Sequence, residues 1–116
     1  MSTLHRFYTA FAQRDWSSIG ACYRDDARFS DPVFPDLDAA ATRAMWKMLM
    51  TGAKDFRLTY SVIEETSTSG RVQWDAYYTF SKTGRAVHNR VTSTFTLKDG
   101  LILVQEDHFD FWHWSR

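Results

Sequence analysis

The sequence predicts an α+β fold in which three N-terminal helices pack on a mainly antiparallel sheet. Apolar residues recur at helical spacing as far as Met50, whereas from Phe56 onward they alternate with polar residues in the two-residue period of a strand. A chain of 116 residues can bury one hydrophobic core but is too short for two. We therefore expect a single domain over residues 1–116.

The first two helices are expected to form a hairpin. Ser2 or Thr3 can cap a helix over residues 4–13. Asp15 can cap a second, shorter helix that ends at the charged residues 24–26. The apolar side chains with the spacing of a core-facing stripe are Leu4, Phe7, Phe11 and Ala12 on the first helix, and Trp16, Ile19 and Tyr23 on the second.

A short strand over residues 27–31 and a loop with two prolines precede the third helix. Asp36 or Asp38 caps this helix. It runs through Met50, and Gly52 stops it. The side chains that we expect to point inward from it are Thr42, Met45, Trp46 and Leu49.

Four antiparallel strands make up the C-terminal half. The first begins at Phe56, and the others cover residues 71–81, 85–97 and 101–111. Thr83-Gly84 suits a two-residue hairpin, and residues 98–100 suit a three-residue loop. Loops of these lengths predict four pairs across the strands: Tyr78 with Asn89, Trp74 with Ser93, Val91 with Asp107, and Ser93 with Gln105.

A polar patch is expected inside the apolar face of this sheet. Convergent polar groups in an apolar concavity are typical of a ligand site. The same groups can instead form a buried hydrogen-bond network that satisfies only itself. The strand residues that alternation directs toward the helices are Trp74, Tyr78, Asn89, Ser93, Gln105 and Asp107, and the residues expected to converge on them are Phe34, Met45 and Trp46.

Asp31 is a second candidate carboxylate beside Asp107. It lies where an apolar helical segment gives way to a strand, so it can lie against the core and act as an acid or a base. An Asp before Pro also commonly accepts hydrogen bonds from backbone N–H groups at a turn. The sequence leaves both roles open.

Composition and charge favour a small neutral ligand. Fourteen Lys and Arg balance fourteen Asp and Glu, so no net field attracts nucleic acid or an anionic membrane. Aromatic residues make up 16% of the chain, which suits a thick core or a ring-lined pocket. Cys22 is the one cysteine and the four histidines lack metal-ligand spacing, so we expect no disulfide, no metal and no cofactor. With no secretory signal and no membrane-spanning apolar run, the expected location is the cytoplasm.

The outer face of the sheet is expected to carry apolar area. Tyr77, Ile102 and Val104 should lie there, beside the polar His88 and His108. That is more apolar surface than a solvated sheet normally shows. A second copy of the chain would cover it, so we expect a homodimer.

Four features of the chain together match a known family. They are the helical hairpin, the segment Tyr-x-x-Asp-Ala-x-Phe-x-Asp-Pro at 23–32, the third helix, and the strand meander that ends Gln-Glu-Asp-His-Phe-Asp at 105–110. With these features the whole chain resembles the nuclear transport factor 2-like superfamily, and SnoaL-like proteins are the nearest branch. The resemblance implies a cone-shaped, cystatin-like α+β roll with a curved sheet, a pocket between helices and sheet, and a homodimer.

The resemblance extends to ketosteroid isomerase-like members, in which the Asp before Pro is the proton-shuttling base. Asp31 matches that residue. The two oxyanion-hole positions of those enzymes correspond to Phe7 and Ser93, and the neighbouring Tyr8 should point elsewhere. An enolate would therefore lack its hydrogen-bond donors here.

The resemblance also extends to limonene-epoxide hydrolase-like members, which use an Asp-Arg-Asp set. Asp107 matches one Asp of that set, in a similar terminal strand motif. The other two positions carry Trp74 and Ala76, so the acid and the guanidinium are missing.

The sequence thus predicts a SnoaL-like protein with an apolar pocket for a small hydrophobic organic molecule. Two roles stay open. In one, the protein is a cofactor-independent isomerase, cyclase or hydrolase that uses Asp107 or Asp31 in acid–base chemistry, with burial raising the pKa of Asp107 while Asn89 and Tyr78 orient the ligand. In the other, it is a non-catalytic module for ligand binding or dimerisation.

Overall fold

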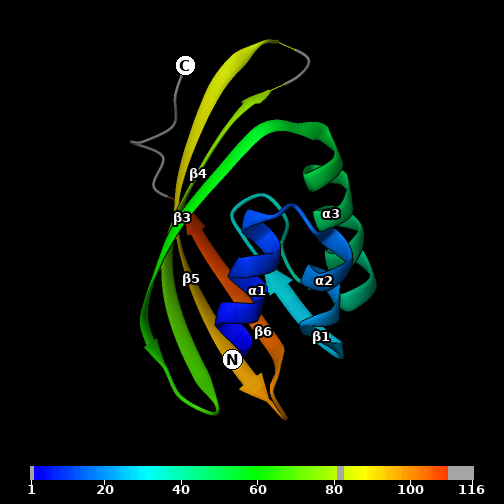
Figure 1. The fold of residues 1–116 in the computed structure, drawn as a ribbon. Helices are drawn as coiled ribbons and strands as arrows, with labels where there is room; N and C mark the ends of the chain where they lie inside the picture. Colours follow the sequence, from blue (N-terminus) through cyan, green and yellow to red (C-terminus); the bar gives the residue numbers. More distant parts are fainter. Residues whose placement is uncertain (1, 81–82, 110–116) are drawn as a thin grey trace.

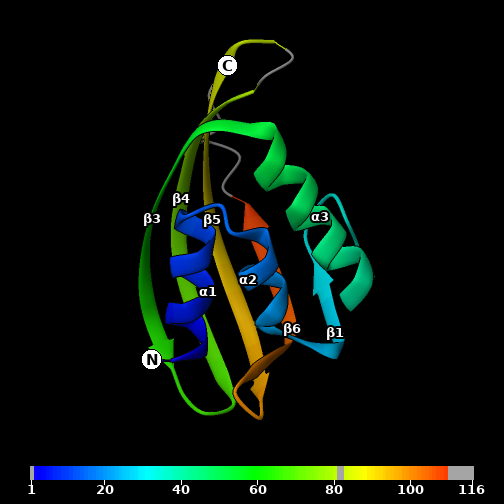
Figure 2. The same ribbon diagram turned by 45° about the vertical axis from the view of Figure 1, so that its right-hand side comes forward.

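The structure, a computed structural model that describes residues 2–80 and 83–109, has three helices on the concave face of a six-stranded sheet (Figure 1). A second view shows that all three helices cover this one face (Figure 2). The expected α+β class is confirmed. In chain order the elements are α1 (Thr3–Ala12), α2 (Trp16–Ala21), β1 (Tyr23–Ser30), β2 (Leu37–Asp38), α3 (Ala39–Gly52), β3 (Ala53–Glu65), β4 (Ser69–Phe80), β5 (Arg85–Lys98) and β6 (Leu101–Phe109).

Side-chain caps begin all three of these helices. Each cap satisfies one of the N–H groups that the first turn of a helix leaves unpaired. The cap of α1 is Ser2 and not Thr3, and the cap of α3 is Asp38 and not Asp36. Asp15 is confirmed as the cap of α2. The backbone N–H groups that the caps accept are those of His5 for Ser2 at 3.1 Å, Ser18 for Asp15 at 3.1 Å, and Ala41 for Asp38 at 2.8 Å.

The strand order of the sheet is β2-β1-β6-β5-β4-β3, with β1 parallel to β6 and the other neighbours antiparallel. β1 begins at Tyr23, so the expected strand over residues 27–31 is too short and Tyr23 does not belong to the second helix. β2 occupies a segment for which no strand is expected. Both differences arise from pairing between strands: β1 pairs with β6, and β2 pairs with β1. Local periodicity does not predict such partners.

The β4–β5 pairing differs from the expected register by two residues. Phe80 pairs with Arg85, so the connection covers residues 81–84 and is not a two-residue hairpin. Tyr78 consequently pairs with Val87 instead of Asn89. Because a shift of two residues is even, each side chain stays on its expected face of the sheet.

The β5–β6 connection is a two-residue turn and not the expected three-residue loop. Asp99 has φ of 56° and Gly100 has φ of 75°, and Lys98 pairs with Leu101. Two consecutive positive φ angles define a type I′ turn, whose twist matches that of the flanking strands. The last strand is described as far as Phe109, and the expected residues 110–111 of this strand lie outside the described part.

A β-bulge at Leu103 changes the faces of β6. Leu97 pairs with Ile102, but Thr96 pairs with Val104, so Leu103 has no counterpart on β5. The bulge turns Ile102 into the core, where it is fully buried, and the expectation that it lies on the outer face is wrong.

The two-residue turn and the bulge together set the pairs at the far end of β6, because each shifts the expected register by one residue. Asp107 pairs with Ser93 and not with Val91, and Gln105 pairs with Phe95 and not with Ser93. Gln105 and Asp107 both face inward, as expected, and both are buried.

The core is built around aromatic rings of α1. The buried stripe of α1 includes Tyr8, which the sequence does not predict. It excludes the predicted Ala12, which is exposed. On α3, Leu49 is 41% exposed and does not point inward as the sequence predicts, because the last turn of the helix directs Met50 into the core instead. Phe7 makes edge-on ring contacts between 4.9 and 6.2 Å with Tyr8, Phe11, Tyr23, Trp46 and Phe95.

No helix in the described part of the chain is long and apolar enough to span a membrane.

Gly100→Ala should destabilise the protein by about 1 kcal/mol, because an L side chain is strained at the positive φ of Gly100. Gly52→Ala is the matched control: a Cβ there meets no atom within 4 Å, and alanine is favoured over glycine in a helix. Urea unfolding of both variants measures the difference. A Gly100→Ala protein as stable as wild type would contradict the type I′ turn.

Candidate functional site

Asp107 on β6 lies at the meeting point of a buried hydrogen-bond network. Its side chain is 3% exposed. Its Oδ1 oxygen accepts a hydrogen bond from Ser93 Oγ at 2.5 Å and another from Gln105 Nε2 at 3.0 Å. Its Oδ2 oxygen accepts none from the described residues.

Two tryptophan indoles extend this network in separate branches. In the first, Trp74 Nε1 donates to Ser93 Oγ at 2.8 Å. In the second, Trp46 Nε1 donates to the Tyr23 hydroxyl at 2.9 Å, and this hydroxyl donates to Gln105 Oε1 at 2.5 Å. We call the six residues the Asp107 network: Tyr23, Trp46, Trp74, Ser93, Gln105 and Asp107.

Burial raises the pKa of Asp107 to about 7, because removal from water disfavours the charged form. The hydrogen bonds from Ser93 and Gln105 oppose this rise, since they stabilise the carboxylate. The negative charge of Asp31 adds to it. Asp107 is therefore poised to gain or lose a proton near neutral pH.

Tyr8 on α1 is fully buried beside this network, and the expectation that it points elsewhere is wrong. Burial, and then the charge of Asp107, raise the pKa of Tyr8 well above its ordinary value, whereas the nearby Ser93 hydroxyl opposes the rise. Tyr8 Oη has no hydrogen-bond partner among the described residues. Helical spacing could have located it, because Leu4, Tyr8 and Phe11 fall on one stripe.

A cavity of about 390 Å³ lies among α1, α3 and the strands β3–β5. We call it the α3–β4 cavity. Phe11 lies in its wall, with ring centroids 5.0 Å from both Trp46 and Trp74. The cavity is mainly apolar, and the side chains used below are Phe11, Trp46, Phe56, Trp74, Tyr78 and Asn89.

Asn89 brings a polar atom to this wall. Its Oδ1 oxygen is buried and has no hydrogen-bond partner among the described residues. Burial raises the pKa of Tyr78, and the nearby Asn89 side chain opposes that rise. The two residues expected to orient a ligand thus lie together at the cavity.

The expected site residues fall into three places. Trp46, Trp74, Tyr78 and Asn89 line the α3–β4 cavity. Ser93, Gln105 and Asp107 do not line it and are joined to it through the indoles. The expected ligand contacts Met45 and Phe34 lie elsewhere: Met45 is in the core, and Phe34 is 39% exposed in the loop after β1.

Asp31 has the turn geometry that its place before Pro32 suggests. Its Oδ1 oxygen accepts the backbone N–H of Val33 at 2.7 Å and that of Phe34 at 2.5 Å. Asp31 is only partly buried, so its second oxygen is not committed to the turn by these bonds. It acts on Asp107 through its charge.

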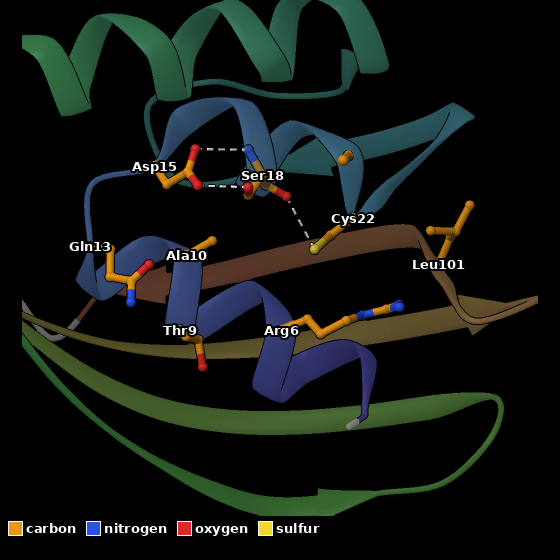
Figure 3. Close-up of a pocket in the computed structure, with 9 residues that line it drawn as sticks. Arg6, Thr9, Ala10, Gln13, Asp15, Ser18, Cys22 and Leu101 are labelled. Atoms are coloured by element: carbon orange, nitrogen blue, oxygen red, sulfur yellow. Dashed lines mark hydrogen bonds between the residues drawn. The ribbon is translucent and has the colours of Figure 1, made fainter.

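A second groove lies between α1 and α2 (Figure 3). Cys22 reaches it from the end of α2, and its Sγ donates to the Ser18 carbonyl at 3.4 Å. Burial raises the pKa of the Cys22 thiol, so the thiol is held in its unreactive protonated form. Asp15 at the rim is occupied in capping α2. This groove therefore lacks the chemistry that the Asp107 network offers.

One polar cluster on the outer face of the sheet joins His88, Asp75 and Arg90. His88, which lies on this face as expected, contacts Asp75 Oδ1 through Nε2 at 2.8 Å and stacks on Tyr77 with ring centroids 4.3 Å apart. Arg90 donates to the same Asp75 oxygen at 3.0 Å. These contacts give His88 a structural partner on the face away from the cavity.

Comparison with known families identifies the relationship of this fold. The sequence profile of the SnoaL-like domain matches residues 4–105. The chain belongs to the SnoaL-like domain family. The match covers α1 from its second residue, the network residues up to Gln105 and most of the sheet, and it confirms the resemblance inferred from the sequence. Among curated proteins, none matches this SnoaL-like domain significantly.

Solved structures share the fold at low sequence identity. IdmH, a proposed polyketide cyclase from Streptomyces antibioticus, is 19% identical and superposes with a TM-score of 0.79 over 96% of this chain and 91% of its own. An LEH-like epoxide hydrolase from M. tuberculosis is 17% identical, with a TM-score of 0.74 over 96% and 82%. A protein with a ketosteroid isomerase-like fold from Catenulispora acidiphila, in complex with trimethylamine, is 6% identical, with a TM-score of 0.80 over 96% of this chain and 87% of its own. These likenesses confirm the cone-shaped fold of the SnoaL-like domain.

Asp107→Asn should stabilise the protein at neutral pH. The folded state binds the Asp107 proton more tightly than the unfolded chain, in which the pKa is about 3.9. The stability from this proton is fully present below about pH 4 and is lost as the pH rises to about 7, by about 4 kcal/mol at about 1.4 kcal/mol per pKa unit. Asn keeps an acceptor at Oδ1 and stays neutral, so the loss should disappear.

Thermal and urea unfolding between about pH 4 and about pH 8 measures this effect, because the range spans the pKa of Asp107 in the unfolded and in the folded state. Glu106→Gln, on the exposed neighbour that points to the other face, is the control and should keep the wild-type slope. An Asp107→Asn protein that is less stable than wild type at neutral pH would mean that the carboxylate is ionised and held by Ser93 and Gln105.

Tyr8→Phe and Tyr23→Phe should have opposite effects on stability. Tyr8→Phe removes a buried hydroxyl without a partner among the described residues, which should stabilise the protein by about 1 kcal/mol. Tyr23→Phe leaves Trp46 Nε1 and Gln105 Oε1 unpaired, which should cost about 1–3 kcal/mol. Urea unfolding compares them; equal effects would show that the Tyr8 hydroxyl has a partner in solution.

Proposed function

We propose that this SnoaL-like domain binds a small, largely apolar organic molecule in the α3–β4 cavity. The wall of the cavity carries the proposal. Aromatic rings from α1, α3, β3 and β4 supply its apolar area, and about 390 Å³ is within the range of small-molecule sites. The balanced charge of the chain also disfavours a strongly ionic ligand.

The polar atoms at the cavity fit one further property of the ligand. Asn89 Oδ1 is an acceptor that gains no hydrogen bond from the described residues. A buried acceptor without a donor costs free energy, so a ligand that carries a hydroxyl or N–H group would recover it. The best fit is an apolar molecule with one such donor.

The catalytic form of this proposal is a cofactor-independent isomerase, cyclase or hydrolase. Asp107 supports it, because a carboxyl group with a pKa of about 7 can serve as acid or base at neutral pH. Asp107 Oδ2 accepts no hydrogen bond from the described residues, so it is the atom that would exchange the proton. Asp31 would act as the second carboxylate. IdmH and the M. tuberculosis epoxide hydrolase, which share the fold, bear the names of a cyclase and a hydrolase.

The non-catalytic form is a ligand-binding module, and one observation favours it. Asp107 is enclosed, does not line the cavity, and holds two donors on Oδ1. In that form the Asp107 network holds the walls of the cavity in place and transfers no proton to the ligand. A homodimer through the outer face of the sheet is compatible with both forms.

Trp74→Phe should weaken the binding of N-phenyl-1-naphthylamine, a neutral apolar fluorophore with one N–H group. The smaller ring removes stacking area from the cavity wall, so we expect a loss of about 0.5–1.5 kcal/mol, or about 2- to 12-fold in affinity. The increase in probe emission on titration with protein measures the dissociation constant.

Trp16→Phe is the matched control, since Trp16 lies on α2, is 39% exposed and does not line the cavity. Its affinity should equal that of wild type. Failure of the probe to bind at all, or equal losses in the two variants, would count against the α3–β4 cavity as the binding site.

A further inference from the structure

The two indoles in the wall of the α3–β4 cavity are also the ends of the two branches of the Asp107 network. Trp74 lines the cavity and is joined to Asp107 through Ser93 alone. Trp46 lines it from α3 and is joined to Asp107 through Tyr23 and Gln105. Both branches terminate on the same atom, Asp107 Oδ1. Hydrogen-bonded side chains therefore connect the cavity wall directly to a titratable group.

We propose that the α3–β4 cavity is a proton-linked site, in which binding of a neutral apolar ligand against Trp46 and Trp74 drives uptake of a proton by Asp107. The inference rests on the proposed function, because it takes the cavity as the binding site. It adds how that site is regulated: affinity for the ligand depends on pH although the ligand itself carries no charge.

The direction of the linkage follows from the direction of the hydrogen bonds. Ser93 and Gln105 donate to Asp107 Oδ1, so an intact network favours the carboxylate. An apolar ligand replaces water at the indoles, which lowers the local dielectric and disfavours the carboxylate. If the ligand displaces an indole, the hydrogen bond from its Nε1 is lost, and the other hydrogen bonds in the same branch weaken. Both effects favour protonated Asp107, so the complex binds a proton that the free protein releases.

Few other charges can account for a pH dependence here. The groups that act on Asp107, or that Asp107 acts on, are Asp31 after β1, Tyr8 on α1 and Tyr23 on β1. Burial raises the pKa of both tyrosines well above the ordinary value of about 10, so both hydroxyls stay neutral around pH 7, where Asp107 titrates. Asp31 is the one charged group in the described part of the chain with an effect on Asp107, and it lies outside the two branches.

The first experiment needs no ligand. Tryptophan emission of the free protein should show a transition near pH 7, because Trp74 and Trp46 sense the charge at the end of their branches. Asp107→Asn should abolish this transition, and Glu106→Gln should leave it unchanged. Two further variants should move its midpoint in opposite directions. Ser93→Ala should raise it, since a donor to the carboxylate is lost, whereas Asp31→Asn should lower it, since a like charge is lost.

The second experiment measures the linkage with N-phenyl-1-naphthylamine, which stays neutral across this pH range. Affinity should be highest at low pH and should fall as the pH rises through 7, by up to about tenfold for each unit by which the ligand raises the pKa of Asp107. Calorimetric titration in two buffers of different ionisation enthalpy should report net proton uptake. Asp107→Asn should bind the probe with an affinity that does not change with pH.

The outcomes separate the linkage from the proposed function. If the probe binds wild type with the same affinity at every pH, the linkage is wrong and the binding site stands. If the probe does not bind at any pH, the proposed function fails and the linkage fails with it. Persistence of the emission transition in Asp107→Asn would assign it to unfolding or to another titratable group, and its loss in Glu106→Gln as well would show that it is not specific to Asp107. Either result would overturn the linkage.

Discussion

The burial of one carboxyl group among aromatic rings is the constraint on which the rest of the site depends. Asp107 is almost inaccessible to water, so its charge must be either neutralised or stabilised by donors. The structure does both in part: burial raises the pKa to about 7, and Ser93 and Gln105 donate to one oxygen. Those donors in turn fix the indoles of Trp74 and Trp46, which form the inner wall of the cavity.

A single bulge makes that burial possible. In a regular strand, residues five apart point to opposite faces, yet Ile102 and Asp107 are both buried. The extra residue Leu103 restores the alternation, so β6 contributes Ile102 to one end of the core and Asp107 to the other. The type I′ turn at Asp99-Gly100 sets the first pairs of β6, Lys98 with Leu101 and Leu97 with Ile102, and the bulge follows directly after them.

The division between filled core and open cavity follows from where the helices end. Phe7 fills the centre beneath α1, where rings from α1, β1, α3 and β5 meet edge to edge. Beyond Phe11 the helix α1 stops at Ala12, whereas β4 and β5 continue past α3 (Figure 1). The α3–β4 cavity lies beyond the end of α1, between α3 and the strands, and is bordered by the exposed Met48 and Leu49. The α3–β4 cavity therefore occupies the part of the cone that the helices are too short to fill.

Most of the buried face of α1 and of strands β4 and β5 could be predicted from the sequence, because side-chain periodicity is a local property. Trp74, Ser93, Gln105 and Asp107 all face inward as the alternation of polar and apolar residues indicates. The same pattern, with the family motif at 23–32, was sufficient for the SnoaL-like assignment.

Pairing between strands was not determined in this way. The length of a turn and the presence of a bulge depend on which backbone conformations the packed sheet permits, and two hydrophobic patterns shifted by two residues look alike. The strand pattern therefore predicts Val91 as the partner of Asp107, and only the folded sheet identifies Ser93. The hydrogen bonds of the Tyr23 hydroxyl, and the lack of one at Tyr8, were likewise decided by tertiary structure. A hydroxyl group joins a network only when elements far apart in the chain bring a partner within hydrogen-bond distance, as β6 does for Tyr23 and as none of the described residues does for Tyr8.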